Sequence, residues 1–426
     1  MFTAVIEFIF MATLVLRSSM DYFKRVTFGP LDFNAASLAG TIVIACTLLY
    51  WYFRRKIEVP ILARIFAGWL IINAVFVGVA LLHFGSAGFI AVKEWIRLVS
   101  IFAVFLFSYN CIRTAKDNFL NVLFLALPIP LIVTIHQIFT GGGRVIQTIP
   151  RVFGTFVHPN HLAAFLVLFF ALTWYMLIVS KRKVLLAILL FTEAFALVFT
   201  VTFGGYIVFL IIASLLFASR LAPRRLKILL CCAVAVFIIT FLWTPQCRRK
   251  ASLFKPGVAA ATLQKATPVV IIETFGVPVP SDAPKDSFSW RLENWGRLYK
   301  VWEKRPFIGW GLQMSAAVNP YISSKTQKGY APHNDYLKFL VETGLVGLLG
   351  YLLFALSCAL IFWSEFRRSK DRQIKILLYV IVSVFIAFQI GALADNYSNF
   401  TAVQWYFWAA AAAALRWNAL SMKDKR

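Results

Sequence analysis

The chain has 426 residues, of which 60% are hydrophobic and only 14% are charged. Soluble globular proteins average about 45–50% apolar and about 25% charged residues, so this composition excludes an ordinary soluble protein. The apolar runs are long and do not alternate with polar residues, which argues against an outer-membrane β-barrel. We therefore predict an all-α integral membrane protein.

Runs of roughly 17 or more apolar residues mark the candidate transmembrane helices. They fall at 2–16, 35–53, 61–82, 89–110, 118–139, 161–180, 184–201, 204–219, 226–243, 337–363, 374–394 and 400–417. The sequence thus predicts about 12 transmembrane helices. Nine of them lie in 1–243, a loop follows over 244–336, and 337–426 holds the last three and a tail.

Lys and Arg are concentrated in the short segments on one side of these predicted helices, such as 54–56, 181–183 and 224–227. Because positive residues in short loops mark the cytoplasmic side, both termini are predicted to be cytoplasmic. The loop over 244–336 then lies on the outer side.

The outer loop over 244–336 is also strongly basic, in a chain whose net charge is +25. It is too long for the short-loop rule to govern it, so its charge indicates an anionic ligand. Nucleic acid is not expected outside a membrane, whereas lipid phosphate and pyrophosphate groups are abundant there and suit Arg. Two interpretations stay open: membrane lipids anchor the loop, or it binds an anionic lipid-linked substrate.

The densest polar and aromatic stretch of the chain spans 288–350. An amphipathic helix is predicted over about 289–303, lying in the membrane interface and carrying Arg291 and Arg297. One Pro and two Gly within 306–311 end that helix in a tight turn.

The segment Pro332-His333-Asn334-Asp335 directly precedes the tenth predicted helix. Asn334 or Asp335 can cap that helix, which holds His333 at the outer membrane surface. His333 then either contributes only to the cap or serves as a general base beside the basic loop. We favour the general base.

A second polar segment, from Arg151 to His161, leads into the sixth predicted helix. His158 and His161 suggest a metal, yet matching carboxylates or thiols are missing nearby, and Pro159-Asn160 is typical of a helix start. We therefore predict no metal, treat Arg151 as a phosphate contact, and treat His158 and Asn160 as supporting residues.

Two further outer segments carry charge. Glu94 and Arg97 lie in the fourth predicted helix, where charged side chains pair with each other or face a polar cavity. Arg97 is therefore either the partner of Glu94 or a contact to substrate pyrophosphate. The turn over 395–399 is interpreted as a simple hairpin, although Asp395 can add a carboxylate to the same outer cavity. No nucleotide-binding motif occurs, and no cofactor is predicted.

Three outer segments resemble the bacterial O-antigen ligase and Wzy-type polysaccharide polymerase superfamily of membrane glycosyltransferases. They are FGTFVHPNHLAAFL at 153–166, Arg291 followed by the Pro-x-x-Gly-x-Gly turn at 306–311, and, most strongly, HNDYLKFLVETGLVGLLGYL from His333. The resemblance covers roughly 150–350.

The resemblance implies a GT-C-like multi-pass protein of the bacterial inner membrane with a large periplasmic loop and a periplasmic active site. It implies transfer of a glycan from undecaprenyl pyrophosphate to an acceptor hydroxyl on a glycan or on lipid A-core, without metal or nucleotide sugar. The resemblance implies that His333 and Arg291 are catalytic residues. It implies the same, less directly, for Arg151. Many members carry a Ser-Arg pair where this chain reads FTVTFGG at 199–205, so Arg97, Arg151 or Arg297 must replace that cation.

The residues also support a coherent chemistry. Clustered Arg side chains stabilise the negative charge of a departing pyrophosphate, and a neutral imidazole assists the acceptor hydroxyl. We assign Arg291 and Arg297 to the first task and His333 to the second, with inversion at the sugar. Whether the acceptor makes the protein a ligase or a polymerase stays open. The alternative function is a multi-span transporter or flippase of an anionic lipid-linked substrate.

Overall fold

The computed structural model describes residues 2–22, 26–28, 31–54, 56–114, 117–146, 149–247, 287–320 and 329–423. These residues are almost entirely helical, which confirms the prediction of a helical fold. Two short antiparallel hairpins, which the sequence analysis did not predict, are the exception. Two stretches of the predicted outer loop, 248–286 and 321–328, lie outside the described residues.

The first part of the chain forms six helices and both hairpins. The helices are α1 (Phe2–Met20), α2 (Ala35–Arg54), α3 (Ile61–Phe84), α4 (Phe89–Cys111), α5 (Phe119–Phe124) and α6 (Pro128–Thr140). The hairpins are β1 (Val26–Phe28) with β2 (Leu31–Phe33), and β3 (Arg144–Ile146) with β4 (Ile149–Arg151). The fifth predicted helix is split, because Pro128 lacks a backbone N–H and therefore sits in the first turn of a new helix.

The second part forms the remaining described helices. They are α7 (Pro159–Val179), α8 (Lys183–Phe199), α9 (Phe203–Ala218), α10 (Arg224–Trp243), α13 (Ser287–Glu303), α14 (Asp335–Arg368), α15 (Arg372–Gly391) and α16 (Thr401–Lys423). All of them except α13 follow predicted apolar runs. Helix α13 confirms the helix predicted over 289–303.

Eight helical segments of the described chain are long and apolar enough to cross a membrane. One of these segments is α3 together with α4, and another is α5 together with α6. Helix α9 is apolar but has only 16 residues, against about 20 for a straight span. The total of about 12 spans stays a prediction.

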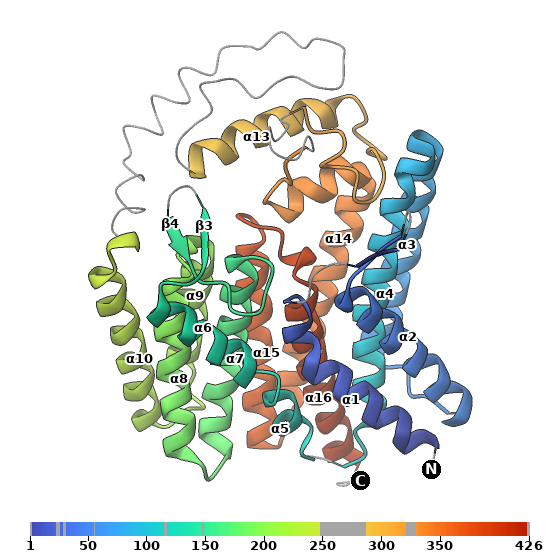
Figure 1. The fold of residues 1–426 in the computed structure, drawn as a ribbon. Coiled ribbons are helices and arrows are strands. Elements are labelled where there is room, and N and C mark those ends of the chain that lie inside the picture. The colour runs from blue at the N-terminus through green and yellow to red at the C-terminus, as the bar shows by residue number, and fades with distance from the viewer. Residues whose placement is uncertain are drawn as a thin grey trace.

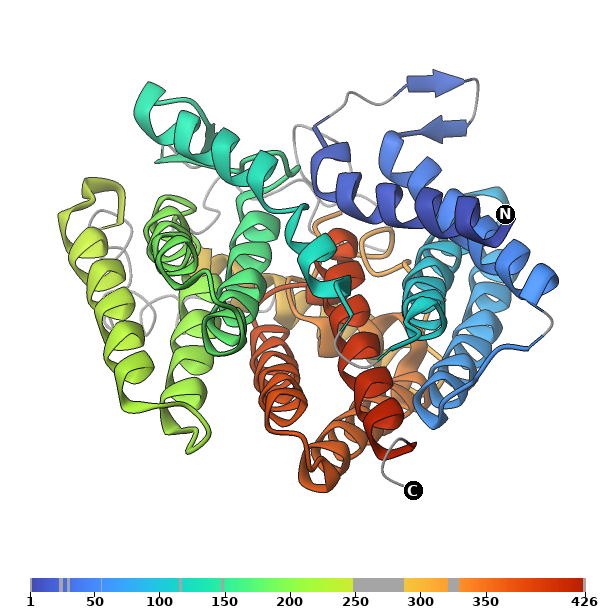
Figure 2. The same cartoon turned by 90° about the horizontal axis from the view of Figure 1, so that it is seen from below.

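The helices form a bundle whose two ends differ. Both termini lie at one end, and α13 crosses the opposite end, near β3 and β4 (Figure 1). Viewed along the bundle, α7, α15 and α16 occupy the middle, with α10 at one edge and α2 to α4 on the other side (Figure 2). The alanines at 409–414 of α16 are all buried, because such small side chains let neighbouring helices approach closely.

Helix α14 is interrupted, although the sequence analysis expected one continuous helix over 337–363. Gly344 has φ 63° and ψ −166°, a backbone conformation outside the helical region. The backbone groups around this break are paired with the 306–311 turn. Trp310 N–H donates to Val341 O at 3.1 Å, and Leu345 N–H donates to Pro306 O at 2.8 Å. We call this backbone pairing of 306–311 with the α14 break the α14 clamp.

The glycines of the α14 clamp are explained by this close approach. A Cβ atom at Gly309 would lie 2.6 Å from the backbone of Glu342, and one at Gly311 would lie 2.5 Å from Ala80. A Cβ atom at Gly344 would overlap the carbonyl oxygen of Phe307. The Pro-x-x-Gly-x-Gly turn therefore serves to fasten the outer segment to the membrane-spanning bundle.

Candidate active site

His333 lies just before α14 and is held from two directions. Its backbone has φ 50°, a left-handed conformation that a non-glycine residue keeps only where its surroundings enforce it. The His333 N–H donates to Asn396 Oδ1 at 2.8 Å, and ring atom Nδ1 lies 3.0 Å from Asp395 Oδ1. The Trp290 ring of α13 meets the imidazole nearly edge-on, with 5.7 Å between ring centroids. The imidazole is therefore fixed between the α15–α16 turn and α13.

Asp395 joins several segments of the chain at one carboxylate. It also accepts hydrogen bonds from the Asn160 side chain and from the Asn396 backbone N–H. Burial alone would raise its pKa, but the hydrogen bond from His333 and the charge of Arg291 hold the pKa well below its ordinary value. An ionised carboxylate can only accept, so Nδ1 of His333 carries a proton and donates it to Asp395, which leaves Nε2 as the nitrogen that faces away from this carboxylate.

Arg151 of β4 is buried against the turn between α8 and α9. Its Nε donates to Thr200 O at 2.8 Å, and its Nη2 donates to Thr202 Oγ1 at 2.7 Å and to Asn160 Oδ1 at 3.0 Å. Burial lowers the pKa of Arg151 to about 10, so the side chain keeps its charge at neutral pH. The intervening Val201 has φ 47°, which is unusual for a β-branched residue.

A hydrogen-bond chain therefore runs from His333 through Asp395 and Asn160 to Arg151. Its members come from the segment before α14, the α15–α16 turn, the start of α7, and β4. These segments lie far apart in the sequence and meet at the end of the bundle that α13 crosses (Figure 1). The structure thus brings four residues of three predicted polar segments into one site.

The two histidines beside Asn160 have local roles. His158 caps α7, because its Nδ1 accepts from the Asn160 N–H at 3.2 Å, as the predicted helix start requires. Burial and the neighbouring Arg151 charge lower the pKa of His158 to about 3, so its imidazole is neutral at physiological pH. His161 packs on Phe400 with ring centroids 4.4 Å apart. Among the described residues, no group of three His, Cys, Asp or Glu side chains has metal-site geometry.

Helix α13 places its two predicted arginines differently. The six-residue spacing between Arg291 and Arg297 turns them toward different faces of the helix. Arg297 forms a 2.6 Å ion pair with Glu293. Arg291 follows Trp290, and its buried Nε has no hydrogen-bond partner among the described residues. Burial lowers the pKa of Arg291, and the charge of Asp395 opposes that shift, which indicates that Arg291 faces the His333 side.

Residues 185–352 match the family model described as O-antigen ligase. The chain carries an O-antigen ligase domain. A search of curated proteins found no match. The match confirms the resemblance to the O-antigen ligase and Wzy superfamily that the sequence indicated. The matched domain includes Arg291, Arg297, His333 and the α14 clamp, whereas Arg151, Asn160 and Asp395 of the same site lie outside the match.

Arg97 belongs to a buried ionic network beside the site. Two of its nitrogens donate to the Glu94 carboxylate at 2.8 and 2.6 Å, and a third donates to Ser398 O at 2.7 Å. Lys338 Nζ lies 3.3 Å from the same Glu94 carboxylate and 3.7 Å from Glu342. The Glu94–Arg97 pair expected as one of two alternatives is therefore present, and the guanidinium is largely committed to partners within the protein.

We expect Arg97→Ala to lower the free energy of unfolding by about 3 kcal/mol, because removing one partner of a buried ion pair leaves the other poorly compensated. Thermal unfolding in detergent measures this loss. Arg297→Ala is the control, since a partly exposed pair four residues apart contributes about 0.5 kcal/mol or less. If Arg97→Ala instead keeps the wild-type stability but loses enzymatic activity, Arg97 contacts the substrate.

The two candidate caps of α14, Asn334 and Asp335, have different contacts in the structure. Asn334 caps α14, accepting from Leu337 N–H at 3.0 Å, as predicted. Asp335 instead accepts from the backbone and hydroxyl of Ser398 at 2.8 and 2.5 Å and from Asn396 at 3.2 Å. It thereby ties the start of α14 to the turn that carries Asp395.

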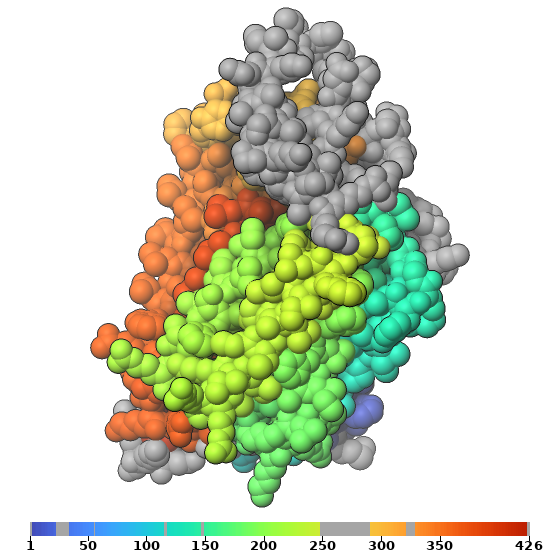
Figure 3. Space-filling model, turned by 90° about the vertical axis from the view of Figure 1, so that its left-hand side faces the viewer, coloured from blue at the N-terminus to red at the C-terminus, as the bar shows by residue number. Residues whose placement is uncertain are grey.

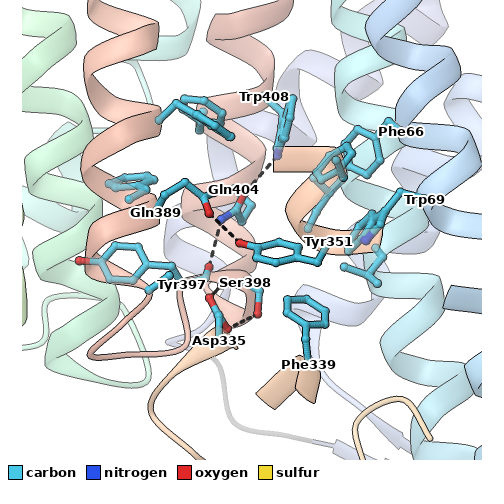
Figure 4. A pocket seen from close by; sticks show the side chains of 17 residues that line it. Phe66, Trp69, Asp335, Phe339, Tyr351, Gln389, Tyr397, Ser398, Gln404 and Trp408 are labelled. Atoms are coloured by element: carbon cyan, nitrogen blue, oxygen red, sulfur yellow. Dashed lines mark hydrogen bonds between the residues drawn. The ribbon is translucent and has the colours of Figure 1, made fainter. Parts of the chain in front are cut away.

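A cavity of about 60 Å³ lies next to Asp335, inside the bundle (Figure 4). Its walls are mostly aromatic and include Trp69 and Tyr351, and the Tyr351 hydroxyl donates to Gln389 at 2.9 Å. A volume of this size holds a few water molecules.

Asp395 is the functional residue that the sequence analysis undervalued. The turn at 395–399 was interpreted as a simple hairpin, yet it supplies the carboxylate that holds His333. One signal was present in the sequence: Asp395 is the only acidic residue between Asp371 and Asp424. A lone acid at the end of an apolar helix is costly unless a partner compensates it.

Proposed function

We propose that the protein is a membrane glycosyltransferase that moves a glycan from undecaprenyl pyrophosphate to an acceptor hydroxyl. The site lies at the α13 end of the bundle, which faces the periplasm, and the termini are cytoplasmic in a bacterial inner membrane. The observation that carries this proposal is the His333–Asp395 pair with Arg291 beside it. Membership of the O-antigen ligase superfamily supports a lipid-linked glycan and an acceptor as substrates in general.

In the proposed reaction, His333 is the general base. Asp395 holds Nδ1–H, so the Nε2 lone pair takes the proton of the acceptor hydroxyl as its oxygen attacks the anomeric carbon. The bond from that carbon to the pyrophosphate oxygen breaks, and the electron pair leaves with the pyrophosphate. A single displacement of this kind inverts the anomeric configuration, which NMR of the product tests.

The departing pyrophosphate is stabilised by arginines in this proposal. Arg291 is the first of them, because its buried Nε has no partner among the described residues and can donate to a phosphate oxygen. Arg151 is the second and replaces the cation of the missing Ser-Arg pair, since its guanidinium hydrogen-bonds to the α8–α9 turn, where that pair is expected. Cations fixed in a buried site stabilise developing charge without reorganisation, so the scheme needs no metal. Arg97 takes a positioning role through its pair with Glu94, and Arg297 is not assigned to the reaction.

The two arginines of α13 give a matched test of this assignment. With a synthetic undecaprenyl-pyrophosphate glycan and EDTA present throughout, Arg291→Ala should lower transfer by about 10²–10³-fold, the usual loss for one charge-stabilising donor. Arg297→Ala should stay within about threefold of the wild type, because the Arg297–Glu293 ion pair is partly exposed and such pairs contribute little.

The reverse order of effects would place the pyrophosphate on the Arg297 face of α13. Absence of transfer by the wild-type protein, with either lipid A-core or a second lipid-linked glycan as acceptor, would overturn the glycosyltransferase proposal. The two acceptors also separate a ligase from a polymerase, since the chemistry at His333 is the same for both.

A further inference from the structure

Helix α10 is the most exposed of the candidate membrane spans. Only 17% of its membrane-crossing window is buried, less than for any other of the eight segments. It lies at the edge of the bundle, and Figure 3 shows it as the yellow-green ridge on that face. Its surface is therefore available to a partner in the membrane.

A groove of about 520 Å³ runs along the first half of this helix. It is lined by Phe217 of α9 and by Arg224, Lys227, Ile228, Cys231, Cys232 and Ala235 of α10. Cys231, Cys232 and Ala235 have small side chains, so the surface is recessed between the larger side chains around them. From Arg224 to Ala235 an α-helix rises roughly 16 Å, about the depth of one leaflet of a 30 Å hydrocarbon core.

The two charged residues of the groove lie together at its mouth. Neither Arg224 nor Lys227 forms an ion pair with any described residue, and the sequence holds no acidic residue from 194 to 272. Lys227 Nζ lies 5.5 Å from the centroid of the Phe217 ring, which fixes the ammonium over the groove. The mouth is at the end of the bundle that carries both termini (Figure 1).

We propose that this groove is a binding site for one anionic phospholipid of the cytoplasmic leaflet. The phosphate of the lipid lies at Arg224 and Lys227, and an acyl chain lies along the small side chains up to Ala235. The inner leaflet is the anionic surface to which such basic clusters bind. This site is separate from the proposed glycan transfer, and it rests on the proposed function only for the orientation that places the termini in the cytoplasm.

A second copy of the chain fits this surface less well. In a twofold-symmetric contact the same patch meets itself, so Arg224 and Lys227 of one copy would approach the same cations of the other. Like charges brought together in this way oppose association, whereas a lipid phosphate neutralises them.

Native mass spectrometry of the detergent-purified chain tests the proposal with phosphatidylglycerol as the anionic probe and phosphatidylethanolamine as the comparison. Arg224→Gln with Lys227→Gln should weaken phosphatidylglycerol binding about 25-fold, because each cation near an anionic lipid contributes about fivefold in affinity. Ala235→Trp, which fills the apolar part of the groove, should also lower the affinity at least tenfold.

Arg367→Gln with Lys370→Gln is the matched control, since both side chains are exposed and lie three residues apart, Arg367 in the last turn of α14 and Lys370 just after its end. This control should leave phosphatidylglycerol binding unchanged. Equal binding of both lipids by the wild type, or equal loss in the control, would overturn the proposal. A dimer that Ala235→Trp dissociates, with no bound lipid, would show that the groove is an interface between copies.

Discussion

His333→Ala should lower the rate of glycan transfer by roughly 10²–10⁴-fold, the usual contribution of a general base. The loss should appear in kcat, with little change in the KM for the lipid-linked donor, because the imidazole acts on the acceptor proton only in the transition state. Transfer by purified protein, with product separated from donor, measures both constants. His136→Ala, at an exposed histidine of α6, is the matched control and should transfer at the wild-type rate.

Asp395→Asn extends the same prediction to the positioning residue. A neutral amide at this place no longer requires the proton to reside on Nδ1, so the fraction of His333 with a basic Nε2 falls. We expect kcat to fall by about 10²–10⁴-fold, again without a matching change in donor KM. Wild-type kcat in both variants would show that the His333–Asp395 pair is structural. Loss of thermal stability without loss of kcat would support that conclusion.

Gly344→Ala should prevent stable assembly of the α14 clamp. The backbone at this position has φ 63° and ψ −166°, a region that residues other than glycine rarely occupy, and the added Cβ would overlap the carbonyl oxygen of Phe307. We expect a loss of about 4 kcal/mol or more in the free energy of unfolding, which is at the upper end for single substitutions. Thermal unfolding and size-exclusion chromatography in detergent measure it.

Gly350→Ala in the same helix is the control for this prediction. A Cβ atom there would meet only ordinary contacts at 3.8 Å from Ile72, so the change should be neutral or stabilise the helix by up to about 1 kcal/mol. A wild-type melting temperature for Gly344→Ala would show that the break in α14 is not required. In that case the 306–311 turn would fasten to α14 in some other way.

The sequence by itself determined the positions of the helices and the family that the chain resembles. Hydrophobicity is a local property, so the apolar runs locate α1 to α10 and α14 to α16 without any knowledge of their packing. The polar and aromatic pattern of 289–303 likewise predicts α13, and the segment from His333 carries the resemblance that the family match confirms. The break at Gly344 was not predictable in this way, because the same run also contains Gly347 and Gly350, which lie in continuous helix.

Only the tertiary structure decided which polar residues meet. Asp395 and His333 are 62 positions apart, and Arg151 reaches Thr202 across 51 positions, so their pairing depends on which helix ends are neighbours in the bundle. The same holds for Arg97, whose partners include Ser398 on a distant turn. Helix packing sets these distances through side-chain shape along whole helices. An isolated segment carries no such information. Whether Arg97 pairs with Glu94 or contacts a substrate could therefore be decided only from the fold.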